Sequence, residues 1–530
     1  MIAIILFHTA NNYAVAANNR APLYHYAGGL LIEQDKLCKT ISEYGLGLNY
    51  FADTRYPALL AAALYPYYTI AGVTQLSLVM SNTLFLCLML FSVYGIGKLV
   101  NSRDTGLLAA FILPAFPQIF GLSRHYDLRF QMAAVASASI YLLLKSDGLA
   151  RYLYTFLFGL SVGIGISIKP EYSVYVIGPW AIIMLRSVAG KQHTRLTLLA
   201  GLLVCSLGLC AGLFANGGLD LQAIDHALFA MSPTDEARQV NPAYYIKSLI
   251  GIQALHFYSA LFALSALYFI YRKHHNILLA WFAVPLLFFT FAAYRNLNIV
   301  FMTPALPAVS LMVSAFITGV KRKTAKRTLV SLAVLTGLAQ ILLISYFPES
   351  YPAISRINSF IGIEKIQLEQ NQDILYYDSV HGSFPGHVRH IGYLHAFGSD
   401  WGINHVSELI SNHSSRGPYV IVLDADIHHI ISQPLGYKLY EHGITESKII
   451  ALEDSIFEGQ IPENDSGTAP GSADFVVFTS RGSRLASIRE LIKVTTRTYS
   501  PIGQATLPDG NVVFVHKKND SGRTTYGLLS

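Results

Sequence analysis

The stretch GLLAAFILPAFPQIFGL-SRHYDLRF-QMAAVASASIYLLL, residues 106–144, joins two apolar runs through a strongly polar octapeptide. Arg124, His125, Asp127 and Arg129 fall within six positions of that octapeptide. A membrane-spanning helix needs about 20 mostly apolar residues, and ionisable side chains at a membrane border are costly unless they are solvated or paired. The stretch therefore predicts two spanning helices joined by a polar loop with a function.

The composition of the whole chain agrees with a membrane protein. Of its 530 residues, 52% are hydrophobic and 13% are charged, whereas soluble domains usually carry about 25% charged residues. The long apolar runs end near residue 347. We therefore expect a polytopic α-helical membrane domain over 1–347 and a soluble domain over 348–530. The formal net charge of +6 is modest and does not indicate a nucleic-acid partner.

The apolar runs predict about eleven transmembrane helices. A further run, YPALLAAALYPYYTIAG at 56–72, contains Pro57, Pro66 and a cluster of tyrosines, which favours a helix lying in the membrane surface. The expected spans are 1–16, 75–97, 105–122, 131–145, 152–168, 172–186, 196–216, 249–271, 276–294, 297–319 and 328–347.

Basic residues between the spans predict how the chain is oriented in the membrane. They recur in alternate loops, ending with KRKTAKR at 321–327, and all are cytoplasmic if 56–72 does not cross the membrane. We accordingly expect a multi-pass protein of the inner or plasma membrane. The segments expected on the extracytoplasmic (periplasmic) side are 17–74, 123–130, 169–171, 217–248, 295–296 and everything after about 348.

The C-terminal segment resembles a small α/β domain. The runs DILYY, YVIVL, DFVVF and NVVFVH are typical of strands, and WGINHVSELISNH is typical of a helix. Asp424 and Asp426 follow the second of these strands, with His428 and His429 close behind. We interpret this as an acidic strand end and not as a metal site, because no glycine-rich phosphate loop precedes it.

Polar residues from four separate loops are predicted to meet at one membrane border. They are Arg55, the 123–130 octapeptide, Lys169 with Glu171 in IKPEY, and Tyr294 with Arg295 in AAYRNLN. Arg and Lys bind phosphate by charge and by hydrogen bonding, so this rim suits a large anionic headgroup. Simpler interpretations are that Arg124 and Arg129 are lipid-headgroup anchors and that Lys169 is a helix end whose side chain reaches the membrane surface. Asp127 is then a salt-bridge partner of its arginines.

Three motifs resemble the GT-C fold glycosyltransferases, in particular the ArnT and protein-O-mannosyltransferase branch (glycosyltransferase family 39). They are RYPALLAAALYPYYTIAG, SRHYDLRFQMAAVASASIYLLLKSDG and YTFLFGLSVGIGISIKPEYSVYVIGPWAII, and a fourth, YRNLNIVFMTPALPAVSLM, follows later in the chain. The resemblance covers residues 17–320. It implies an integral membrane enzyme that transfers a sugar from a polyprenyl-phosphate donor to a lipid, glycan or protein acceptor.

The resemblance also implies roles for particular residues. Asp127 matches an acidic loop residue near the sugar phosphate, and Arg55, Lys169 and Arg295 match cationic positions around the lipid-linked phosphate. The same rim adds Arg124, His125, Arg129, Glu171 and Tyr294 as substrate-binding candidates.

The position of the general base departs from the family pattern. The family carries an acidic pair shortly after its first helix, whereas this chain has Asn18 and Asn19 there. Asparagine cannot act as a general base, so Asp53 and Glu33 become the catalytic candidates beside Asp127, with Asp35, Glu43 and His25 as further acids or bases nearby.

Two other functions remain open from the sequence. A transporter or flippase of a lipid-linked anion would use the same cationic rim, and a non-catalytic GT-C-like assembly protein would explain the missing acidic pair. The cofactor is unknown; a divalent cation is left open, and no metal ligands are assigned.

Overall fold

The computed structural model divides the chain into two compact units. Unit 1 comprises Met1–Asn18, Gln34–Gln370 and Ile374–Ala396, and unit 2 comprises Asn19–Glu33, Asn371–Asp373 and Phe397–Ser530. The structure describes residues 1–18, 25–44, 58–124, 127–189, 243–272, 276–292, 299–347, 357, 366–368, 375–377, 387–388, 402–414, 419–424, 435–444, 447–452, 473–479, 499–506 and 512–519.

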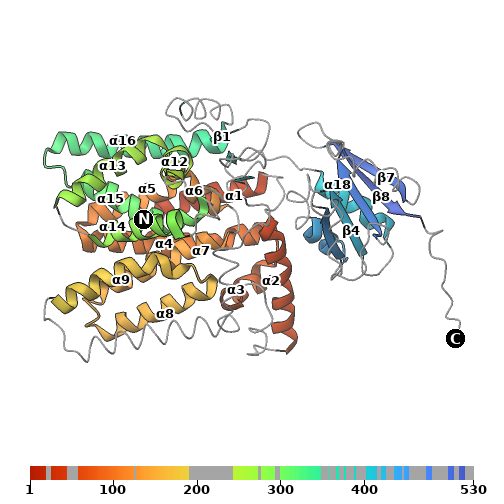
Figure 1. Cartoon of the computed structure of the whole chain (residues 1–530), viewed down its shortest axis with the longest axis horizontal. Helices are drawn as coiled ribbons and strands as arrows, with labels where there is room; N and C mark the ends of the chain where they lie inside the picture. The colour runs from red at the N-terminus through yellow and green to blue at the C-terminus, as the bar shows by residue number, and fades with distance from the viewer. Residues whose placement is uncertain are drawn as a thin grey trace. The chain divides into compact units, whose positions relative to one another are not determined.

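Unit 1 is built from apolar helices packed side by side, with α4 against α5 and α7 near its centre (Figure 1). One further helix, α2 (His25–Tyr44), begins among the residues of unit 2 and ends among those of unit 1. It lies in the segment 17–74, for which the sequence predicted an extracytoplasmic position and no helix before residue 56. The helices of unit 1 are α1 (Ile2–Asn18), α3 (Ala58–Ala71), α4 (Gln75–Val100), α5 (Arg103–Ile112), α6 (Pro117–Ser123), α7 (Leu128–Lys145), α8 (Tyr152–Ile168), α9 (Tyr172–Ala189), α12 (Tyr244–Ser248), α13 (Leu255–Arg272), α14 (Asn276–Leu287), α15 (Leu306–Thr318) and α16 (Lys323–Tyr346).

The described residues of unit 1 also include shorter helical turns and three short strands. The strands β1 (Ile366–Leu368), β2 (Leu375–Tyr377) and β3 (His387–Val388) pair antiparallel in that order. The turns are η2 (Leu113–Ala115), the π-helical η3 (Leu249–Gln253) and η4 (Phe288–Ala292), and η5 (Ile299–Ala305), which leads into α15.

Several helices of the described residues are apolar enough to enter a membrane. Three are also long enough to cross it: Leu76–Val100, Val300–Thr318 and Lys323–Tyr346. Shorter apolar helices lie at Ile2–Ala17, Tyr152–Ile168, Tyr172–Arg186, Leu255–Tyr271 and Asn276–Phe291. The expected total of about eleven spans stays a prediction.

The apolar run at 105–122, expected as one span, is bent in the structure. Arg103–Ala115 and Pro117–Ser123 meet at an angle of 70°. Pro114 lacks a backbone N–H, and Phe116, which precedes Pro117, takes an extended conformation with ψ of 127°. Proline both interrupts the helical hydrogen bonds and disfavours helical geometry in the residue before it, so the pair of prolines accounts for the bend.

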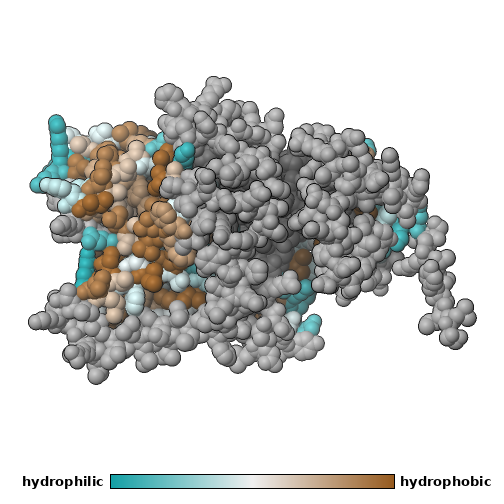
Figure 2. Space-filling view, viewed as in Figure 1, coloured by the Kyte–Doolittle hydropathy of each residue, from teal (hydrophilic) through white to brown (hydrophobic). Residues whose placement is uncertain are grey.

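Apolar side chains fill the interior of unit 1 and also cover much of its outer surface. Trp281, Phe116 and Phe130 are fully buried in the core, whereas Phe91 on α4 and Leu335 on α16 are more than half exposed. Figure 2 shows this exposed apolar surface as brown side chains over the helices of unit 1, with hydrophilic side chains at the helix ends. Large exposed apolar areas of this kind suit contact with lipid.

Small residues bring α4 and α5 unusually close together. A Cβ atom built on Gly97 would lie 2.5 Å from the Cα of Gly106, so neither position has room for a side chain. Close backbone approach through small residues is a common way for helices to associate in membranes.

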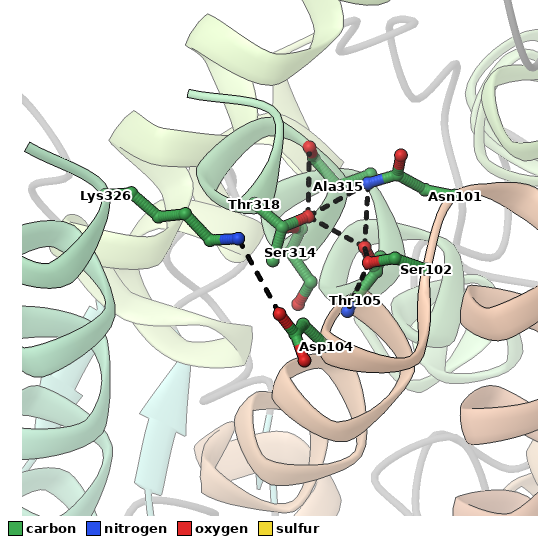
Figure 3. A network of polar contacts seen from close by, with 8 residues as sticks. All are labelled: Asn101, Ser102, Asp104, Thr105, Ser314, Ala315, Thr318 and Lys326. Carbon is green, nitrogen blue, oxygen red and sulfur yellow. Dashed lines mark hydrogen bonds and ion pairs between the residues drawn. The ribbon is translucent and has the colours of Figure 1, made fainter. Parts of the chain in front are cut away.

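A polar network extends this contact to α15 and α16 (Figure 3). The side chain of Asn101 donates to Thr105 at 2.8 Å and to Thr318 at 3.0 Å, and the two threonine hydroxyls are 2.7 Å apart. Lys326 lies 3.7 Å from Asp104. The network therefore links the α4–α5 connection to the α15–α16 connection.

Unit 2 contains a five-stranded mixed sheet in the order β5-β4-β6-β8-β7. β4 pairs parallel with β5 and β6, and β8 pairs antiparallel with β6 and β7. All four predicted strand runs and the predicted helix coincide with elements of the structure: DILYY with β2 in unit 1, the other three runs with β4, β6 and β8, and the helix with α18. The bounds are α18 (Ile403–His413), β4 (Tyr419–Asp424), β5 (Ser447–Leu452), β6 (Phe475–Thr479), β7 (Tyr499–Thr506) and β8 (Val512–Lys518).

We predict that Gly97→Val destabilises the protein by about 2–3 kcal/mol, because the new side chain must push α4 and α5 apart. The measurement is the thermal unfolding of detergent-purified protein, in which size-exclusion chromatography detects the folded fraction after heating. Leu88→Val is the matched control, since Leu88 lies on the exposed face of the same helix and should change the stability by less than about 0.5 kcal/mol. Equal stability of both variants would contradict the close contact.

Candidate active site

Asp127 begins helix α7 and uses its side chain to cap it. Its backbone is extended, with φ of −127° and ψ of 126°, and its Oδ1 atom accepts a hydrogen bond from the backbone N–H of Arg129 at 2.8 Å. Aspartate is among the preferred residues at this position because its carboxylate satisfies an otherwise unpaired N–H group of the first helical turn. The side chain is only 4% exposed, so a buried carboxylate lies at the end of this helix.

Arg129 connects Asp127 to a second buried carboxylate. Its Nη1 atom is 3.7 Å from Oδ2 of Asp127, and its Nε atom is 3.8 Å from Oε1 of Glu171. The guanidinium carbon lies 4.9 Å from the centre of the Phe301 ring, within the range of a cation–π contact. The side chain is 12% exposed. Arg129 thus joins the start of α7 to the turn between α8 and α9.

The turn between α8 and α9 positions Lys169 and Glu171. Helix α8 ends because Lys169 is extended and precedes Pro170. The Nζ atom of Lys169 lies 3.9 Å from Oε1 of Glu171. Glu171 is 2% exposed, whereas Lys169 is 31% exposed. The lysine is therefore the accessible member of the pair.

Packing against α7 holds this turn in place. A Cβ atom on Gly165 would lie 2.3 Å from the ring of Tyr172, so the glycine allows the ring to pack directly on α8. The Tyr172 hydroxyl is 2.6 Å from the hydroxyl of Ser139 on α7, which is in turn 2.7 Å from that of Ser161 on α8. The carboxylate of Glu171 is therefore carried by a rigid turn.

The four charged groups balance one another, with two carboxylates and two cations. The positive charge of Arg129, followed by burial, lowers the pKa of Lys169 below the ordinary lysine value, while Glu171 and Asp127 act in the opposite direction. Such a cluster can bind an anion at its cations and can hold or accept a proton at its carboxylates.

Arg124 lies near this cluster but contacts different helices. Its Nε atom donates to Oδ1 of Asn12 at 3.2 Å, and its Nη2 atom donates to the hydroxyl of Ser345 at 2.8 Å. Its guanidinium carbon is 4.8 Å from the centre of the Phe120 ring, and the residue is 1% exposed. These contacts tie the end of α6 to α1 and α16, so the buried guanidinium has a structural role inside unit 1.

Neutral polar residues inside apolar helices support the same junction, and the sequence interpretation missed them. The amide of Asn82 on α4 donates to the backbone carbonyl of Ser123 at 3.2 Å and accepts from Gln131 on α7 at 2.9 Å. Asn12 also donates to the hydroxyl of Ser123 at 2.9 Å. Buried polar side chains in apolar runs would have been the signal, since each must find a partner there.

The predicted site residues are therefore brought together in part. Asp127, Arg129, Lys169 and Glu171 form one cluster, and Arg124 lies at the adjoining end of α6. Glu33 lies on α2 in the part of that helix assigned to unit 2. Among the described residues no group of three or more His, Cys, Asp or Glu could hold a metal ion. Asp53, Arg55, His125, Tyr294 and Arg295 lie outside the described residues, as do Asn19, Asp426, His428 and His429.

The fold of the chain is that of the GT-C membrane glycosyltransferases. The structure of ArnT from Cupriavidus metallidurans in the apo state is similar with a TM-score of 0.59, at 12% sequence identity over 97% of both chains. The same enzyme bound to undecaprenyl phosphate is similar with a TM-score of 0.57, at 11% identity over 97% of both chains.

A second solved protein shares the fold at lower similarity. The oligosaccharyltransferase of Archaeoglobus fulgidus in the apo form has a TM-score of 0.52 and 12% identity, covering 90% of this chain and 69% of its own. No protein-family model and no curated protein sequence matches the chain. At these identities the similarity establishes the fold alone. The activity has to be argued from the residues of the site.

We predict that Arg129→Gln raises the pKa of Lys169, because it removes the positive charge that lowers this pKa most and leaves Glu171 beside the lysine. The measurement is the midpoint pH for acylation of Lys169, followed by mass spectrometry, which should move to higher pH in the variant. Arg151→Gln, at the opposite end of α8, should leave the midpoint unchanged. A midpoint that stays constant or falls in Arg129→Gln would contradict the coupling.

Proposed function

We propose that the protein is a glycosyltransferase that moves a sugar from a polyprenyl-phosphate donor to a lipid, glycan or protein acceptor. The fold supports this proposal, since the similar ArnT structure was solved with undecaprenyl phosphate bound. The observation that carries it in this chain is the buried cluster of Asp127, Arg129, Lys169 and Glu171, in which two cations lie within 4 Å of two carboxylates.

Each part of the cluster suits one requirement of sugar transfer. An acceptor hydroxyl attacks the anomeric carbon, the bond from that carbon to the phosphate oxygen breaks, and the hydroxyl proton must go to a base. Asp127 is the proposed base or the group that orients the acceptor, because Oδ1 caps the helix and Oδ2 lies toward the arginine. Arg129 and Lys169 would stabilise the negative charge that develops on the departing phosphate.

The arrangement of α16 supports an extracytoplasmic position for this site. The helix has 24 residues and is therefore about 36 Å long, enough to cross a bilayer. Ser345, which contacts Arg124, lies near one end, and the exposed residues Lys321, Arg322 and Lys323 lie at the other. Clustered basic residues favour the cytoplasmic side, so the site belongs on the opposite face of an inner or plasma membrane. We propose the same orientation for the domain over 348–530.

We predict that Asp127→Asn lowers the release of free polyprenyl phosphate from a sugar-linked donor by about 10²- to 10⁴-fold. Asparagine also caps helices well, so the variant keeps the helix cap and loses the negative charge, its basicity and the ion pair with Arg129. The assay uses purified protein, a panel of undecaprenyl-phosphate hexoses and pentoses, and a membrane extract that supplies acceptors.

Asp104→Asn serves as the control for this experiment. It makes the same chemical change in an exposed carboxylate beside Lys326, at the basic end of the helices. The control should retain the wild-type rate. Asp127→Asn at the wild-type rate would refute the role of Asp127, and movement of the donor across vesicle membranes without sugar release would favour a flippase instead.

A further inference from the structure

One oxygen of Glu171 is buried without a hydrogen-bond donor among the described residues. This atom, Oε1, has Arg129 Nε at 3.8 Å and Lys169 Nζ at 3.9 Å, both beyond hydrogen-bond distance. The Glu171 side chain is 2% exposed. A buried carboxylate oxygen in this condition costs free energy, and in native proteins a bound water or ligand usually supplies the missing donor.

The chemistry of the surrounding groups restricts what that ligand can be. A phosphate oxygen would bring a further acceptor to a carboxylate and could not donate to it. A hydroxyl group can donate to Oε1 and accept from a neighbouring ammonium group at the same time. Lys169 provides that ammonium group, and because it is 31% exposed the position can be reached from outside the core.

The nearby hydroxyl of Tyr175 does not compete with Glu171 for this task. The hydroxyl of Tyr175, one turn further along α9, donates to the backbone carbonyl of Phe301 at 2.6 Å and is committed there. The turn that carries Glu171 is fixed by the packing of Tyr172 on Gly165. A carboxylate on a turn that is fixed in this way can discriminate between ligands that carry a hydroxyl at the right place and ligands that lack it.

We infer that Glu171 binds a hydroxyl group of the transferred sugar and is a specificity-determining residue. The inference rests on the proposed function, because it takes the ligand to be a polyprenyl-phosphate sugar. Lys169 donates to the same hydroxyl and also faces the phosphate. Glu171 therefore contacts only the sugar end of the sugar-phosphate headgroup, whereas Lys169 contacts both ends. A site built around such a hydrogen bond rejects the analogue that lacks the hydroxyl.

The test is a double-mutant-type cycle, in which variants of Glu171 are combined with donor analogues that each lack one hydroxyl group. Full-length protein in lipid nanodiscs is titrated with undecaprenyl-phosphate glucose, galactose and mannose, and the tightest binder is then replaced by its monodeoxy analogues. Binding is measured from ligand-induced thermal stabilisation. For the wild type we expect one monodeoxy analogue to bind at least about tenfold weaker than the parent, as the loss of one hydrogen bond to a charged group implies.

The variants Glu171→Ala and Glu171→Gln should reduce that difference to about threefold or less, because the hydroxyl then loses its charged acceptor. Glu171→Gln keeps the size of the side chain and carries the test if the alanine variant does not fold. Asp147→Asn, an exposed carboxylate paired with Arg151, is the matched control and should keep the wild-type difference.

The possible outcomes separate this inference from the proposed function. In one outcome the sugar donors bind, but every monodeoxy analogue loses the same affinity in the wild type and in the Glu171 variants. This result would overturn the role of Glu171 and leave the proposed function standing. Failure of every undecaprenyl-phosphate sugar to bind would overturn both. A selective loss for one hydroxyl that depends on Glu171 supports the inference and identifies which hydroxyl is bound.

Discussion

The ion pairs of Arg129 connect the parts of unit 1 that form the site. A charged side chain that is 12% exposed within a membrane protein must have partners, because the surrounding medium cannot solvate it. Asp127 on one side and Glu171 on the other supply that partnership. As a result, the start of α7 and the turn between α8 and α9 are held together by the same charges that would bind a substrate. Structural and chemical roles cannot be separated at this position.

Much of the helical architecture could be predicted from hydrophobic runs alone. The predicted run at 152–168 coincides with α8, because spanning helices must satisfy their own backbone hydrogen bonds and therefore follow continuous apolar segments. The bend at Phe116 was missed because the effect of Pro114 and Pro117 depends on local geometry that a hydropathy pattern does not report. β7 was missed as well, since YSPIGQAT contains a proline and a glycine, and its register shifts between Pro501 and Gly503.

The charged residues of the site could be predicted from the sequence, whereas the neutral residues that hydrogen-bond near them could not. Asp127, Lys169 and Glu171 stood out because ionisable residues are rare in this chain and occurred at the ends of apolar runs. Asn12, Ser345 and Asn82 carry no charge, and their contacts join helices that are far apart in the sequence, such as α1, α6 and α16. The sequence pattern also gave no reason to assign different roles to Arg124 and Arg129, which are five positions apart. In the structure Arg124 contacts α1 and α16, whereas Arg129 contacts Glu171.

The cap geometry of Asp127 bears on the missing acidic pair at Asn18 and Asn19. A carboxylate whose Oδ1 atom is bound to a helix N–H group has one oxygen fixed in space and the other, Oδ2, fixed with it. Such a group needs no neighbouring acid to hold its orientation, because the helix itself provides it. Arg129 Nη1 lies 3.7 Å from the other oxygen, Oδ2, so both oxygens of this carboxylate have a partner within the structure. The orientation of this acid therefore comes from the start of α7 and from Arg129.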